Sequence, residues 1–131
     1  MIVVDASVIV TALADDGNDG DHARDRLRQE RLIAPHLIDL EVVSAWRRLA
    51  AAADLDERRA QLALEDLRAL RLERVPHGPL LSRCWELRDN LTVYDAAYVA
   101  LAEALDATLL TADARLAGAS VARCEIELIR P

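Results

Sequence analysis

The chain has 131 residues, of which 53% are hydrophobic, enough for one compact domain and too few for two of ordinary size. Its formal net charge is −7, which argues against a nucleic-acid binder that relies on a broad basic surface. No apolar run approaches the roughly 18 residues of a membrane span. Asp5 also interrupts the apolar start where a signal peptide would continue. We therefore expect a single domain over residues 1–131, without a membrane partner, in the cytoplasm.

Short apolar strands alternate with amphipathic helices along the chain. The predicted strands cover 2–4, 32–34, 72–75, 107–111 and, at an edge, 124–129. The predicted helices cover 7–14, 21–31, 36–53, 56–72, 80–87 and 93–105, with a polar loop at 15–21. Asp56 has the position of an N-cap. The alternation predicts an α/β fold with a mostly parallel sheet and helices on its faces.

Two acids follow predicted strands directly. Asp5 comes after Ile2–Val4, and Asp113 comes shortly after the strand that ends at Thr111. Ligands of parallel α/β sheets bind outside the carboxyl ends of the strands, so both acids are expected at one crevice. Each is also compatible with a turn or cap. Ser7 could cap the next helix or hold Asp5 by a hydrogen bond.

Two further acids belong to helices. Asp95 lies in the first turn of the predicted helix 93–105, three residues after Thr92, which also fits a capping arrangement. Glu41 lies in the helix 36–53 beside an expected apolar stripe of Leu40, Val43 and Trp46. An unpaired Glu is costly to bury, so Glu41 is expected to face a polar cleft or a cation, or else to extend to solvent.

The side chains available for a metal are carboxylates. The two cysteines and three histidines show no ligand spacing, so a zinc site is not expected. Cys84 and Cys124 are interpreted as two small hydrophobic side chains, with a chance disulfide as the alternative. Clustered carboxylates repel one another, and a hard divalent cation removes that repulsion. Oxygen ligands suit Mg²⁺ or Mn²⁺.

Four segments of the chain resemble the PIN-domain nucleases, and specifically the VapC-type toxins of toxin–antitoxin systems. The matching segments are Ile2–Ser7, Ala34–Val42, Leu91–Ala102 and Leu109–Leu116. The resemblance implies a three-layer α/β/α sandwich and a Mg²⁺- or Mn²⁺-dependent endoribonuclease acting on tRNA or rRNA. It also implies a homodimer inhibited by a VapB-type antitoxin. It assigns catalysis to Asp5, Glu41, Asp95 and Asp113, and support to the hydroxyls of Ser7 and Thr111.

The expected chemistry is hydrolysis by a metal-activated water. Asp5, Asp95 and Asp113 would hold the metal, while Glu41 could bind a second ion, orient the water or act as the base. The resemblance implies products with a 5′-phosphate and a 3′-hydroxyl. Arginine pairs at 47–48 and 58–59 could contact phosphates, or simply form solvated helix faces.

Other functions fit parts of the pattern. A phospho-acceptor signalling domain also places acids at strand ends, but it needs a lysine, which this chain lacks, and an acid pair after the first strand. A metal-dependent phosphatase would carry a D-x-D motif there, where this chain has Asp5-Ala6-Ser7. A catalytically silent binding module with the same fold is disfavoured by the presence of all four acids. Metal-dependent RNA cleavage is the test that separates these alternatives.

Overall fold

A parallel sheet forms the centre of the molecule. The computed structural model describes residues 1–129, across which five strands pair in parallel in the order β3-β2-β1-β4-β5. The strands are β1 (Ile2–Val4), β2 (Leu32–Pro35), β3 (Leu72–Val75), β4 (Thr108–Thr111) and β5 (Ile126–Leu128). β1 is central, and its three residues are all buried, as expected for a strand covered on both faces. The predicted parallel sheet and its edge strand β5 are confirmed.

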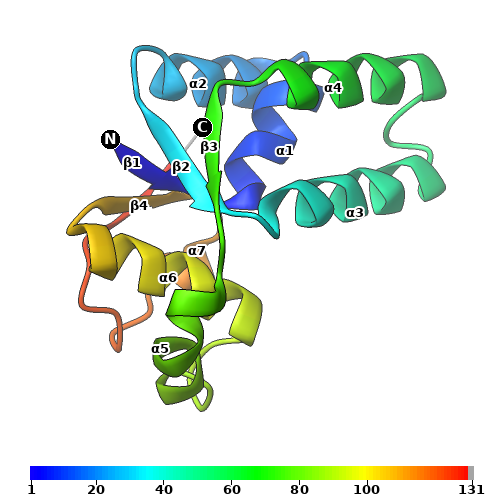
Figure 1. Ribbon diagram of the computed structural model, residues 1–131. Coiled ribbons are helices and arrows are strands. Elements are labelled where there is room, and N and C mark those ends of the chain that lie inside the picture. Colours follow the sequence, from blue (N-terminus) through cyan, green and yellow to red (C-terminus); the bar gives the residue numbers. More distant parts are fainter. Residues whose placement is uncertain (130–131) are drawn as a thin grey trace.

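Helices cover both faces of the sheet. They are α1 (Ala6–Ala14), α2 (Asn18–Leu27), α3 (Ile38–Ala51), α4 (Glu57–Ala69), α5 (Leu81–Glu86), α6 (Val93–Leu105) and the short α7 (Ala114–Ala117), with a 3-10 turn at Gly78–Leu80. α1 to α4 gather on one side and α5 and α6 on the other (Figure 1). α6 contacts β1, β2 and β4, so it covers the middle of the sheet. The expected three-layer α/β/α fold is confirmed.

The helix starts follow local chemistry. The Asp56 side chain caps α4 by accepting a hydrogen bond from the amide of Arg59 at 2.8 Å, as predicted. The α2 helix begins at Asn18, so the predicted polar loop over 15–21 is wrong in its second half. A close approach explains this: a Cβ on Gly20 would lie 1.9 Å from the Asp15 carbonyl oxygen, so only glycine lets the α2 backbone pack against the end of α1.

The buried face of α3 differs from the predicted stripe. Ile38, Val42 and Trp46 are buried, while Leu40 is 77% exposed and Val43 is also exposed. The buried residues are spaced by four, one helical turn, which places them on one face. Trp46 was therefore predicted correctly, and Leu40 and Val43 were not.

The remaining core follows the apolar pattern. Leu67 on α4 is buried, and Leu64 on α4 and Leu70, which directly follows the helix, pack against the core. Both cysteines are free thiols, and Cys84 is buried. None of the helices within residues 1–129 combines the length and apolar character that crossing a membrane requires.

Candidate active site

The candidate site lies where β1 and β4 end. From β1 the sheet extends through β2 and β3 on one side and through β4 and β5 on the other, so the strand order reverses between β1 and β4. Such a reversal opens a crevice at the carboxyl ends of the strands. The Asp5 amide donates to the Leu110 carbonyl at 2.9 Å, which places Asp5 beside Thr111. The predicted meeting of the ends of these two strands is confirmed.

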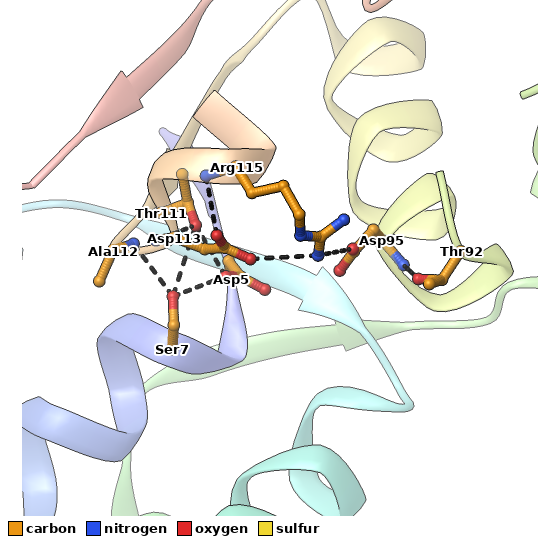
Figure 2. A network of polar contacts seen from close by, with 8 residues as sticks. All are labelled: Asp5, Ser7, Thr92, Asp95, Thr111, Ala112, Asp113 and Arg115. Carbon is orange, nitrogen blue, oxygen red and sulfur yellow. Dashed lines mark hydrogen bonds and ion pairs between the residues drawn. The ribbon is translucent and has the colours of Figure 1, made fainter. Parts of the chain in front are cut away.

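Asp5 is held by two hydroxyl groups. The hydroxyls of Ser7 and Thr111 donate to its Oδ2 at 2.6 and 2.8 Å (Figure 2). Ser7 thus orients Asp5 and makes no cap on α1, which settles the alternative left open by the sequence. Asp5 is only 6% exposed, and this burial raises the pKa of its carboxyl, opposed by the two hydroxyl hydrogen bonds.

Glu41 lies in the first turn of α3, which follows the carboxyl end of β2. It is half-buried, and the hydroxyl of the fully buried Tyr98 donates to its Oε1 at 2.6 Å. Burial raises the pKa of the Glu41 carboxyl, the Tyr98 hydrogen bond opposes the rise, and the negative charges of Asp5 and Asp95 add to it. Glu41 therefore shares the electrostatic environment of those two acids, as the prediction of a polar cleft requires.

Asp95 and Asp113 are joined by a cationic side chain. Nη2 of Arg115 lies 2.8 Å from Oδ2 of Asp95 and 3.2 Å from Oδ2 of Asp113 (Figure 2). Asp95 comes from the first turn of α6, where the Thr92 hydroxyl accepts from the Asp95 amide at 3.1 Å. Asp113 caps α7 by accepting from the Arg115 amide at 2.9 Å. The capping roles foreseen for these positions are thus compatible with membership of the site.

Two residues of the site were missed by the sequence reasoning. Tyr98 lies in a strongly apolar helix, where only its hydroxyl, which needs a partner when buried, indicated a polar contact. Arg115 follows Asp113 by two positions and gave no indication of its reach toward Asp95. Among the arginines suggested for phosphate contacts, Arg59 instead binds the carbonyls of Leu13 and Ala14 and so holds α4 to the end of α1.

The comparison with known proteins identifies the fold family. A model described as the PIN domain matches residues 2–121, a range that includes all four acids. The chain belongs to the PIN-domain family. Ribonuclease VapC9 of Mycobacterium tuberculosis is 46% identical over 129 residues, covering 98% of each chain. Ribonuclease VapC1 of the same organism is 47% identical over 129 residues, covering 98% of this chain and 97% of its own.

Two solved structures have a similar fold. PAE2754 from Pyrobaculum aerophilum superposes with a TM-score of 0.71 at 23% identity, covering 95% of this chain and 87% of that one. FitAcB from Neisseria gonorrhoeae superposes with a TM-score of 0.66 at 18% identity, covering 96% of each chain. At these identities the likeness supports the fold alone.

The donor chemistry of this PIN domain suits a hard cation. All four candidate ligands are carboxylates, and a cation, the Arg115 guanidinium, already bridges two of them. Within residues 1–129, no three His, Cys, Asp or Glu side chains converge closely enough to hold a metal ion in the arrangement observed. The carboxylate oxygens match the ligand type that Mg²⁺ and Mn²⁺ prefer, and in this arrangement Asp95 and Asp113 are engaged by the guanidinium.

Proposed function

We propose that this PIN domain is a Mg²⁺- or Mn²⁺-dependent endoribonuclease that acts as the toxin of a toxin–antitoxin pair on RNA of the translation machinery. The observation that carries the proposal is the grouping of Asp5, Glu41, Asp95 and Asp113 around the carboxyl ends of β1 and β4. The names of the relatives, Ribonuclease VapC9 and Ribonuclease VapC1, support RNA as the substrate class.

The four acids would have distinct tasks. Asp5, Asp95 and Asp113 would hold the ion, directly or through water, and the ion when bound activates water and stabilises charge on the phosphodiester. Glu41 is the best candidate to accept a proton, because its raised pKa makes it a stronger base than an ordinary carboxylate. Tyr98 binds Oε1 of Glu41 and so orients the carboxylate in the site. Ser7 and Thr111 support Asp5 and are not expected to touch substrate.

A groove beside Glu41 supports single-stranded RNA as the ligand. Its volume is about 410 Å³, and it is lined by Leu37, Leu40, Glu41, Ser44, Arg48 and Tyr94. Tyr94 is 64% exposed at the start of α6, where its ring is free to stack on a base. Arg48 is exposed on α3 and could pair with phosphate. This groove supplies a local binding surface on a chain whose net charge is unfavourable for RNA, so we expect modest, salt-sensitive affinity.

Exposed apolar side chains support the proposal that this chain binds other proteins. The partners we propose from the family are a second copy of the chain and a VapB-type antitoxin. The exposed side chains lie on α3, α4 and α5 and include Leu40, Val43, Leu62, Leu81 and Trp85. Leu40 and Val43 are three positions apart on α3, and Leu81 and Trp85 are four positions apart on α5, so each pair lies on one exposed face of its helix. Light scattering of the purified chain tests for a second copy. Repeating it with the product of any short open reading frame found immediately upstream tests for the antitoxin.

The decisive experiment is RNA cleavage by the purified chain, freed of any copurified protein. Total tRNA and rRNA would be incubated at low salt with Mg²⁺, Mn²⁺ or EDTA, beside an Asp95→Asn variant. We expect discrete fragments with 5′-phosphate and 3′-hydroxyl ends that require metal and disappear in the variant. Fragments ending in 2′,3′-cyclic phosphates would refute the metal-water route. Intact RNA together with no metal-dependent rise in melting temperature would instead favour a silent binding module.

A further inference from the structure

Arg115 occupies the position between two carboxylates that the proposed function assigns to a metal ion. One nitrogen, Nη2, reaches both Asp95 and Asp113, at 2.8 and 3.2 Å. These acids belong to different elements, the start of α6 and the N-cap of α7, so a single guanidinium joins the two (Figure 2). In the part of the chain that the structure describes, it is the one arginine that contacts any of the four acids.

A metal ion bound directly by Asp95 and Asp113 would compete with this guanidinium for the same carboxylates. Mg²⁺ or Mn²⁺ would draw on the same carboxylate oxygens that Nη2 contacts at 2.8 and 3.2 Å. An arginine keeps its proton at any pH at which proteins are folded, so it cannot yield the position by deprotonation. Arg115 would therefore have to move away for these two carboxylates to hold an ion directly.

The contacts around Arg115 allow that movement. Its side chain is 62% exposed and so has solvent to move into. Asp113 is positioned independently of the guanidinium, because its Oδ1 accepts from the Arg115 amide at 2.9 Å and its own amide donates to the Thr111 hydroxyl at 3.0 Å. The backbone contacts thus keep Asp113 in place when the Arg115 side chain leaves.

We propose that Arg115 is an internal counter-ion that competes with the divalent ion for Asp95 and Asp113 and so sets the metal concentration at which the nuclease is loaded. The inference rests on the proposed function, because it requires an ion at these carboxylates. Without metal, the guanidinium offsets the repulsion between Asp95 and Asp113. With metal bound, the ion takes over that task and the arginine returns to solvent.

The test measures binding of Mn²⁺ alone, by calorimetry and by electron paramagnetic resonance, to the full chain and three variants. Arg115→Gln should bind Mn²⁺ about three- to tenfold more tightly than the wild type, the range expected when exposed ion pairs no longer have to be broken. Arg115→Lys keeps the positive charge but loses the planar guanidinium, so its affinity for Mn²⁺ should lie between those of the wild type and Arg115→Gln. Arg47→Gln removes the same charge from an exposed position on α3 and should bind like the wild type.

The outcomes separate this inference from the proposed function. If Arg115→Gln and Arg47→Gln bind Mn²⁺ with equal affinity, any gain comes from net charge alone and the competition is refuted, while metal binding by the wild type stands. Weaker binding by Arg115→Gln, with an unchanged melting temperature, would mean that Arg115 organises the site instead. Absence of Mn²⁺ binding in every variant would overturn the inference together with the metal site on which it depends.

Discussion

Removing the hydroxyl of Tyr98 isolates one hydrogen bond of the site from everything else. Tyr98→Phe keeps the buried ring, so no cavity forms, and deletes only the donor that lies 2.6 Å from Glu41 Oε1. Hydrogen bonds to charged groups contribute about 1.5–3 kcal/mol to stability. Glu41 is only half-buried, so water can replace part of the lost donor. We therefore expect the free energy of unfolding to fall by about 1–2 kcal/mol near neutral pH.

Urea denaturation of the metal-free protein measures this loss. Tyr94→Phe is the matched control, because Tyr94 is 64% exposed on the same helix, and it should change stability by less than about 0.5 kcal/mol. A double-mutant cycle with Glu41→Gln assigns the loss to the pair, since the two changes should combine to less than the sum of their separate effects. The Tyr98 hydrogen bond also lowers the pKa of Glu41, so RNA cleavage by Tyr98→Phe should need higher pH than cleavage by the wild type.

Two results would contradict this reasoning. A loss no larger than that of Tyr94→Phe would show that the Tyr98 hydroxyl contributes no net stability. Strict additivity in the double-mutant cycle would show that the stability contributed by the Tyr98 hydroxyl does not depend on Glu41. An unchanged pH profile of cleavage would separate Glu41 from the proton transfer step while leaving the stability argument intact.

Burial raises the pKa of Asp5, so its contribution to folding is fully present below about pH 4 and is lost as the pH rises through the raised value. Metal-free Asp5→Asn should therefore melt higher than the wild type at neutral pH and not at pH 4, and a lower melting temperature at neutral pH would contradict this. Thr111→Val removes the 2.8 Å hydrogen bond to buried Asp5 and should lower the free energy of unfolding by about 1–3 kcal/mol. The same change at the partly exposed Thr108 is the control, and equal losses would show that the Asp5 contact contributes little. Asp56→Ala removes the α4 cap and should lower the free energy of unfolding by about 1 kcal/mol, a loss that Asp56→Asn should largely restore; an alanine variant as stable as wild type would exclude the cap.

The layout of the sheet was predictable because it follows from repeating local patterns. Short apolar runs separated by amphipathic segments predict parallel strands, and parallel strands place their carboxyl ends at one edge. That rule was enough to bring Asp5 and Asp113 to the same crevice. The error on α3 arose from the local register: Leu40 and Val43 were counted with the apolar face, whereas the core is contacted by the face that includes Ile38.

The contacts that complete the candidate site were not predictable in the same way. Tyr98 and Glu41 are 57 positions apart in the sequence, and Arg115 and Asp95 are 20 apart. Both contacts therefore depend on how α6 lies against α3 and α7. The apolar pattern indicates that Tyr98 is buried, but it does not select its partner. An exposed arginine is not part of the apolar pattern, so the sequence did not predict a contact between Arg115 and Asp95.

The hydrogen bond between Thr111 and Asp5 spans 106 positions of sequence, and β1 pairs with β4 rather than only with its neighbour in the chain. During synthesis, the N-terminal strand is therefore made long before the strand that completes its surroundings. Until the chain has been elongated past Asp113, Asp5 lacks Thr111, Asp113 itself is missing from the four acids, and β1 has no β4 beside it. A ribosome carrying an unfinished copy would thus be exposed to a chain without an assembled set of carboxylates. For a protein proposed to cut RNA of the translation machinery, late closure of the sheet delays activity until most of the chain has been made.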